Sequence, residues 1–193
     1  LKNALVAAGE ELLSEAGAET LSLRKVAARA GVSHSAPYAH FADREALFAA
    51  ISAVGFQNLH NRLSETYEAY KDDPAKGMVE TAFTYLDFAL ERPARFKLMF
   101  SGIIKDIRQY PELVEISHRT FDLIEEEVVA LQAHGLLPKG KSDLLALTVW
   151  SMVHGFISLY LEGQISRRIL HQAELRAILV EILSKICLQP LPY

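Results

Sequence analysis

The stretch "RKVAARAGVSHSAPYAHFADREALF", residues 24–48, decides the fold of this chain. From Leu23 to Ala30 the apolar residues recur at the helical spacing i, i+3, i+4 and i+7, which predicts a helix with one buried face. Gly31 permits the positive φ of a tight turn, and a short second helix is expected over about residues 34–40. A helix, a turn containing glycine and a short helix together predict a helix-turn-helix.

The second helix of this unit would present hydrogen-bonding side chains at its start. Ser33 or Ser35 can cap it. Once the cap is satisfied, the first turn, with His34 and Ser35, can reach base edges in the major groove of DNA. Tyr38 adds a hydroxyl group to the same element, and Arg44 at the start of the following helix is placed to bind phosphate.

Local charge also favours contact with DNA. Between Thr20 and Arg44 there are four basic residues and one acidic residue, a local net charge of +3, whereas the whole chain carries −4. The basic residues are Arg24, Lys25, Arg29 and Arg44. A basic segment on an acidic chain is typical of a confined DNA-binding patch rather than of a protein that coats nucleic acid. The alternative is a corner of a helical bundle with a solvated basic face.

At these residues the chain resembles the tetracycline repressor (TetR) family of bacterial one-component regulators. The runs Ser22 to Ser33, Tyr38 to Phe41 and Asp43 to Leu47 match the family's DNA-binding signature in order and spacing, within a match from about Leu5 to Ile51. The resemblance implies a homodimer, and helical spacing along the chain predicts an all-α protein; neither enzyme activity nor a cofactor is expected. The resemblance also implies a helix-turn-helix domain, residues 1–50, that binds palindromic operator DNA, and a ligand-sensing and dimerisation bundle, residues 51–193. Such a protein is expected to be a ligand-responsive repressor that a small molecule releases from its operator, and the sequence leaves repression or activation open.

Carried over onto this chain, the resemblance implies two groups of DNA contacts. Facing the groove are Ser33, His34, Ser35 and Ala36. Candidates for phosphate or flanking contacts are Ser22, Arg24, Tyr38, His40 and Arg44. Two residues depart from the family pattern: Lys25 stands where an acidic residue often completes a capping box, and Pro37 removes a helical hydrogen bond. The second helix is therefore expected to begin one or two residues later than a Ser33 cap would place it.

Helical patterning continues along the whole chain, and about nine helices are expected. The first would run from about Lys2 to Ala16, where Gly17 stops it, and Asp43 would cap a long helix to about Tyr70. A proline at a first-turn position begins each of the next three helices, which are expected from Pro74 to Glu91, Pro93 to Ser101 and Pro111 to His134. Ser142 would cap a helix reaching Gly163, and the last helix is expected from about His171 to Leu188.

Aromatic residues in the later helices predict a small-molecule site. The run Trp150 to Gly155, with Pro93 to Phe100 upstream, resembles the TetR subgroup whose C-terminal domain carries a Trp-His-Gly signature. Trp150 and His154 are four residues apart and so share a helix face. An apolar chamber around them could be completed by Phe96, Met99, Phe100 and Phe121. The alternative is a hydrogen-bonded core histidine among aromatic residues that only fill the bundle.

The last two helices carry more apolar residues than one core can cover. The helix from Asp143 to Gly163 is apolar nearly all round, and the final helix is rich in leucine and isoleucine. A contact of four helices, two from each subunit, would bury this surface and agrees with the implied homodimer. Internal packing in a monomer is the alternative.

Several classes of protein are disfavoured by what the sequence lacks. The seven histidines include no His-x-x-x-His pair, so no metal site is expected. Neither a phosphate-binding glycine loop nor a Gly-x-Ser-x-Gly motif occurs, which disfavours a nucleotide-binding protein and a serine hydrolase. The apolar run from Leu144 to Leu161 contains His154 and is short for a membrane span. The single Cys187, with no signal-like segment after Leu1, predicts a cytoplasmic protein that is nucleoid-associated when bound to DNA.

Three consecutive acidic residues, Glu125 to Glu127, point to different faces of a helix and are interpreted as solvated surface. Two other function classes stay open. An enzyme that uses the pocket near Trp150 and His154 would turn over a bound small molecule. A helical adaptor for protein partners would bind without the steep salt dependence of phosphate contacts.

Overall fold

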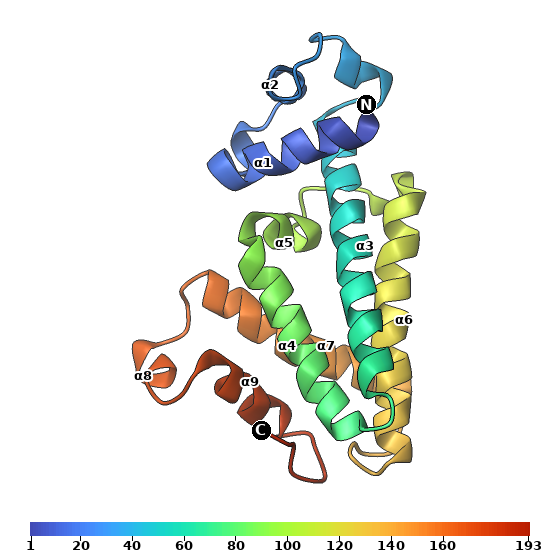
Figure 1. The fold of residues 1–193 in the computed structure, drawn as a ribbon, viewed down its shortest axis with the longest axis vertical. Coiled ribbons are helices and arrows are strands. Elements are labelled where there is room, and N and C mark those ends of the chain that lie inside the picture. Colours follow the sequence, from blue (N-terminus) through green and yellow to red (C-terminus); the bar gives the residue numbers. More distant parts are fainter. The chain divides into compact units, whose positions relative to one another are not determined.

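The computed structural model describes residues 1–193 and is helical throughout, with nine α-helices and two 3₁₀ helices (Figure 1). The all-α prediction is confirmed. In chain order the elements are α1 (Lys2–Thr20), α2 (Leu23–Arg29), η1 (Ala36–Ala39), α3 (Arg44–Tyr70), α4 (Pro74–Glu91), α5 (Pro93–Phe100), η2 (Ile107–Gln109), α6 (Pro111–Ala133), α7 (Ser142–Leu161), α8 (Arg167–Leu170) and α9 (Leu175–Leu183).

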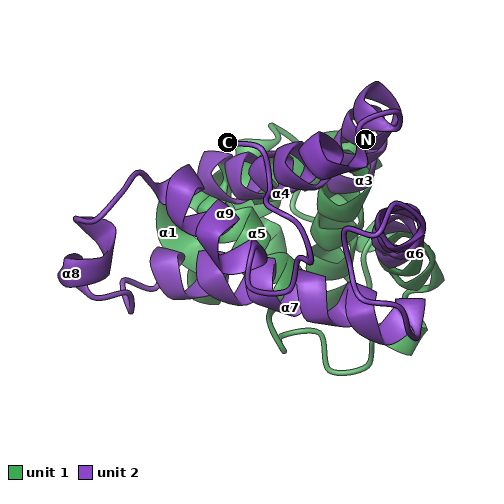
Figure 2. Ribbon diagram, turned by 90° about the horizontal axis from the view of Figure 1, so that it is seen from below, with its two compact units in different colours: residues 1–58, 92–118 green, residues 59–91, 119–193 purple.

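The chain forms two compact units, coloured separately in Figure 2. The first consists of residues Leu1–Asn58 and Arg92–His118, and the second of Leu59–Glu91 and Arg119–Tyr193. Helices α3 and α6 each have residues in both units, so neither unit is one continuous stretch of sequence. The division into a DNA-binding domain of residues 1–50 and a sensing domain of residues 51–193 concerns function, and it stays a prediction.

Local capping signals begin several of the helices where the sequence predicts. The Ser22 hydroxyl accepts a hydrogen bond from the Lys25 amide at 3.3 Å, which satisfies an otherwise unpaired donor at the start of α2. Asp43 Oδ1 accepts one from the Ala46 amide at 2.8 Å at the start of α3. Helices α4, α5 and α6 each begin at a proline, which lacks the amide hydrogen that a first-turn position leaves unpaired.

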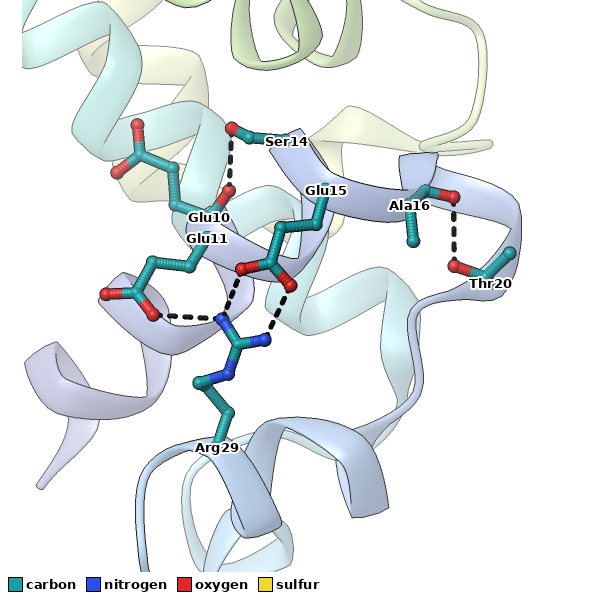
Figure 3. A network of polar contacts seen from close by, with 7 residues as sticks. All are labelled: Glu10, Glu11, Ser14, Glu15, Ala16, Thr20 and Arg29. Carbon is teal, nitrogen blue, oxygen red and sulfur yellow. Dashed lines mark hydrogen bonds and ion pairs between the residues drawn. The ribbon is translucent and has the colours of Figure 1, made fainter.

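Gly17 interrupts the first helix, as predicted, but one more turn follows it. Gly17 has φ 75° and ψ 166°, values that break the helix and that glycine adopts without steric cost. Beyond this break the Thr20 hydroxyl donates to the Ala16 carbonyl oxygen at 3.0 Å (Figure 3). Helix α1 therefore ends at Thr20 rather than Ala16.

Two predictions near the end of the chain are wrong. Ser142 does not cap α7, because it is the first residue of the helix and its hydroxyl donates to Glu125 Oε1 at 2.6 Å. The expected helix of residues 171–188 is shorter, α9, and the four-residue α8 precedes it. At its far end the Leu188 amide donates to the Leu136 carbonyl oxygen at 2.8 Å, a contact outside the helix that sequence spacing could not reveal.

The first unit has an apolar core beneath the helix-turn-helix. Helices α1, α2 and α3 bury Leu5, Val26 and Leu47 completely, and Leu98 of α5 belongs to the same cluster. Val32 of the turn is half-buried against it. This packing holds α2 and the turn after it on the rest of the unit, since burial of each aliphatic side chain contributes about 1.5–3 kcal/mol.

The second unit is a bundle in which α4, α7 and α9 pack on one another. Its core includes Leu86 of α4, Ile157 of α7 and Leu179 of α9, all of them buried. By length and composition alone, helix α7 could cross a membrane, but a single such helix is weak evidence for a span. In the structure 22 % of its most apolar stretch is buried.

Candidate nucleic-acid interface and apolar cavity

The helix-turn-helix is built around Gly31. Helix α2 ends at Arg29, and Gly31 then takes φ +68°, in the left-handed region that favours glycine. The Val32 amide donates to the Ala27 carbonyl oxygen at 3.0 Å and closes the turn. The chain thereby leaves α2 and enters the exposed segment that carries Ser33, His34 and Ser35.

The second element is a single 3₁₀ turn, so the prediction of a helix over residues 34–40 is wrong in type and length. Pro37 is buried, stands in the first turn of η1 and cannot donate to the Ser33 carbonyl oxygen. The Ala36 amide takes that oxygen instead, at 3.0 Å. Helical structure accordingly begins at Ala36, which agrees with the delay expected from the proline.

Neither predicted serine caps this element. Ser35 stands at the N-cap position but its side chain makes no capping hydrogen bond. The hydroxyl groups of Ser33 and Ser35 instead bond to each other at 3.1 Å. The cap prediction is wrong because the 3₁₀ turn starts beyond the reach of Ser33, and both hydroxyls stay exposed at the surface.

Most of the predicted DNA contacts lie at the surface of the first unit. The predicted contact residues that are exposed are Arg24, Ser33, His34, Ser35, Tyr38, His40 and Arg44. Tyr38 is 56 % exposed. Ser22 and Ala36 are half-buried, and the Ser22 hydroxyl already serves as the cap of α2.

The basic patch is weaker than the sequence sum predicts. Figure 3 shows the Arg29 guanidinium reaching two carboxylates of α1, with Nη1 at 2.9 Å from Glu15 Oε1 and 3.1 Å from Glu11 Oε2. The hydrogen bond from Arg29 holds the pKa of Glu15 below its usual value. Arg29 is therefore neutralised within the unit. Arg44 lies 5.4 Å from the Phe48 ring centroid, and its Nη1 donates to the Glu19 carbonyl oxygen at 3.1 Å.

The second unit contains a cavity of about 40 Å³, lined by side chains from α3, α4, α6, α7 and α9. Its wall is mainly apolar and includes Leu63, Met78 and Leu183. Four polar side chains also reach it, those of Thr81, Tyr85, Glu127 and Trp150. An apolar wall with a few polar groups has the composition of a ligand site, but the volume is far below the roughly 300–1,000 Å³ of such pockets.

Tyr85 connects Trp150, which lines this cavity with it, to His154, which does not line the cavity. The Trp150 indole N–H donates to Tyr85 Oη at 3.1 Å, and Tyr85 Oη lies 2.9 Å from His154 Nδ1. Burial lowers the pKa of His154 and raises the pKa of Tyr85, so both side chains are neutral near pH 7. Because the Trp150 indole can only donate, Tyr85 Oη accepts in that bond, and the direction of the bond with His154 follows the tautomer of the imidazole ring.

Comparison with known proteins decides what kind of protein carries these features. Residues 5–51 match the family of bacterial regulatory proteins of the tetR type, and residues 78–183 match the tetracyclin repressor-like C-terminal domain. The first matched segment contains the helix-turn-helix, and the second contains most of α4 and all of α6 and α7, which line the cavity. The chain belongs to the TetR family.

Solved structures agree with this assignment. A protein of unknown function from Rhodococcus sp. RHA1 is 30 % identical, with a TM-score of 0.80 over 95 % of this chain and 91 % of the other. The TetR-family regulator PfmR from Thermus thermophilus is 20 % identical, with a TM-score of 0.70 over 93 % and 96 %. A TetR-family regulator from Marinobacter aquaeolei is 19 % identical, with a TM-score of 0.70 over 96 % and 94 %. No curated protein sequence was found to be similar.

TetR-family proteins are transcription regulators rather than enzymes; they bind operator DNA and typically dimerise. The helix-turn-helix of this TetR-family chain is thus a DNA-binding element. What the family leaves open is the effector, the operator and the helices of the dimer contact.

The six residues predicted to form one effector chamber belong to both units. Phe121, Trp150 and His154 lie together in the second unit, with ring centroids 6.1 Å apart for Phe121 and Trp150 and 5.7 Å apart for Trp150 and His154. In the first unit are Phe96, Met99 and Phe100. The Phe96 and Phe100 ring centroids there are 5.1 Å apart. That all six line one chamber stays a prediction.

Sequence reasoning missed three polar residues of the cavity, Thr81, Tyr85 and Glu127. The interpretation of the Glu125–Glu127 run as solvated surface is wrong for Glu127, which is 8 % exposed. The signal was present in helical spacing, because residue 127 follows the buried Thr120 by seven positions on α6. It therefore lies on the face that α6 turns to the core.

Proposed function

We propose that this TetR-family protein is a repressor that leaves its operator when a small molecule binds in the second unit. The observation that carries the proposal is the exposed segment after Gly31, where Ser33, His34 and Ser35 stand at the surface of a DNA-binding element. These side chains are short hydrogen-bonding groups that a major groove can accommodate. The protein is proposed to act in the bacterial cytoplasm, at the nucleoid.

The DNA contacts are proposed to divide by role. The groove-facing set is Ser33, His34, Ser35 and Ala36, and the set for phosphate or flanking contacts is Ser22, Arg24, Tyr38, His40 and Arg44. Because η1 is one 3₁₀ turn, few side chains can reach bases from it, and His34 has the longest of those at its start. We therefore expect His34 to dominate the choice of sequence.

Two alanine variants test this division. Arg44→Ala should weaken binding to all duplexes and lower the slope of log K against log salt by about 1. His34→Ala should leave that slope nearly unchanged and relax the preference at one or two base pairs, each worth about 1–3 kcal/mol. The measurement is a salt titration of each variant on operator and unrelated duplexes. Equal losses on every duplex from both variants would contradict the division of roles.

The experiment that tests the DNA-binding function itself is a selection from random duplexes with the purified protein. Enrichment of a palindrome, with affinity that falls steeply as salt rises, is the expected outcome. Folded protein that enriches no sequence would overturn the proposal. The same result would favour the alternative of a helical adaptor for protein partners.

The homodimer is proposed to form through the last two long helices, α7 and α9. Three leucines of α7 are open to solvent in the single chain: Leu144 is 57 %, Leu147 45 % and Leu159 52 % exposed. Exposed apolar residues along one helix mark a surface that a second copy can cover.

A charge in this surface should separate the subunits. Leu147→Lys is expected to shift the protein from dimer to monomer in sedimentation at a fixed concentration, because a lysine would be buried in an apolar contact. Val129→Lys is the matched control, since Val129 is 50 % exposed on α6, outside the proposed contact. A Leu147→Lys variant that stays dimeric would place the contact elsewhere.

Release is proposed to work through the helices that the two units share. Helix α3 is continuous from Arg44 to Tyr70 and supplies residues to both units, so a shift at its end in the second unit is carried along it. In a dimer this would move the two DNA-binding elements away from the roughly 34–36 Å spacing of successive major grooves. Only a ligand that binds the two conformations with different affinities can drive the change.

A further inference from the structure

The cavity of the second unit has a carboxyl group in its wall. Glu127 of α6 is 8 % exposed, and the Thr81 hydroxyl donates to its Oε1 at 2.9 Å. Burial raises the pKa of Glu127 to about 7, against a smaller opposite effect of the Thr81 hydrogen bond. At pH 8 the cavity wall therefore carries a negative charge in apolar surroundings.

No cation of the protein offsets this charge. The influences on the pKa of Glu127 are burial and Thr81, and neither is positively charged. The polar pair on the facing helices is engaged elsewhere, since the Trp150 indole donates to Tyr85 and the Tyr85 hydroxyl lies against His154. A buried carboxylate without a counter-ion is costly, and a cationic ligand group would relieve that cost.

We propose that the effector bound in this cavity is an apolar compound with a protonated amine, which donates its N–H groups to Glu127. The inference rests on the proposed function in taking the cavity as the effector site. An ammonium group forms charge-assisted hydrogen bonds with a carboxylate, roughly twice as strong as neutral ones. Its apolar part would contact the aliphatic wall, whereas a carboxylate ligand would be repelled by Glu127.

The size of the cavity limits the shape of this compound. About 40 Å³ is little more than the space of one water molecule, so the ligand must displace side chains as it enters. Met78 in the wall is buried, and an unbranched methionine side chain can change its rotamer to make room. A thin, flexible alkyl chain meets these conditions better than a rigid ring system.

The test uses Trp150, the single tryptophan of the chain, as a fluorescent reporter in the cavity wall. The full chain is titrated at pH 8 with n-octylamine, 1-octanol and octanoate, all below micelle formation. Octylamine is expected to bind at least about tenfold more tightly than either of the others. Glu127→Gln should reduce octylamine to the affinity of octanol, while Glu126→Gln, an equal charge change at the exposed neighbouring residue, should leave the preference intact.

Three results would overturn the inference: equal affinity for the three probes, a preference that survives Glu127→Gln, or no fluorescence response to octylamine. Release of DNA is measured separately, on the duplex that the selection enriches. Octylamine binding without DNA release would support the amine site and contradict the ligand-controlled repressor. Release by octanoate rather than octylamine would support the repressor and contradict the amine site.

Discussion

Replacing Glu10 with leucine is expected to lower the free energy of unfolding by about 3 kcal/mol, since it breaks a buried ion pair. Arg95 Nη1 of α5 lies 2.7 Å from Glu10 Oε1 of α1, and Arg95 is only 4 % exposed. The more exposed Arg92 reaches the same oxygen at 3.2 Å. An arginine cannot lose its proton in a protein, so the variant keeps the Arg95 charge buried without this carboxylate.

The paired variant separates this cause from lost packing. Glu10→Leu combined with Arg95→Met should recover most of the lost stability, because an apolar pair of similar volume carries no desolvated charge. Glu11→Leu is the control: Glu11 is the exposed neighbour of Glu10, and its partner Arg29 is also held by Glu15. Urea unfolding at fixed protein concentration measures all four proteins. A double variant as unstable as Glu10→Leu would show that α1 and α5 depend on shape rather than charge.

The parts of the fold that sequence could predict are those set by neighbouring residues. Ser22, Gly31 and Asp43 act within three residues of their own position, through a cap, a positive φ and a second cap. Pro37 also acts locally, and its missing amide explains why the second element begins at Ala36. The helix-turn-helix was therefore visible in one short stretch.

The parts that sequence could not predict depend on residues far apart in the chain. Glu10 and Arg95 are separated by 85 residues, and Tyr85 and Trp150 by 65. Helical spacing tells which face of a helix is buried, but not which polar side chains meet there. Trp150 and His154 were found because they share one helix, whereas the tyrosine between them stands on another.

Charge patterning misled the sequence analysis at Glu127 for a related reason. A run of three acidic residues is usually solvated, and this holds for Glu126, which is exposed. Glu127 instead lies on the buried face of α6, and its carboxyl group is desolvated as a result.

The consequence of that burial is a pH-dependent stability, which glutamine at residue 127 should remove. The pKa of Glu127 is raised from 4.5 to about 7, chiefly by burial, so the folded state holds the proton more tightly than the unfolded state. The contribution of this proton to the free energy of unfolding is then at its full value below about pH 4.5. It falls as the pH rises to about 7 and is lost above that pH. A shift of this size corresponds to about 3 kcal/mol.

Glu127→Gln is therefore expected to be more stable than the parent protein by about 3 kcal/mol at pH 8, and by much less at pH 5. Tyr67 is the other titratable group affected by this charge; burial and then the charges of Glu126 and Glu127 raise its pKa, so it stays neutral across the range. Urea unfolding at both pH values provides the measurement, and Glu126→Gln should show no such pH-dependent gain. Equal stability of the Glu127→Gln variant and the parent at pH 8 would mean that the carboxylate is solvated or paired in the folded state.

A stabilising glutamine at residue 127 would also bear on why the acid is there. Natural proteins are rarely at their stability optimum, and stabilising substitutions cost function where activity needs a destabilised site. If the glutamine variant gains stability at pH 8 and also loses its preference for octylamine, then Glu127 serves ligand binding at the expense of folding. If it gains stability and keeps the preference, Glu127 costs stability without being the group that binds the amine.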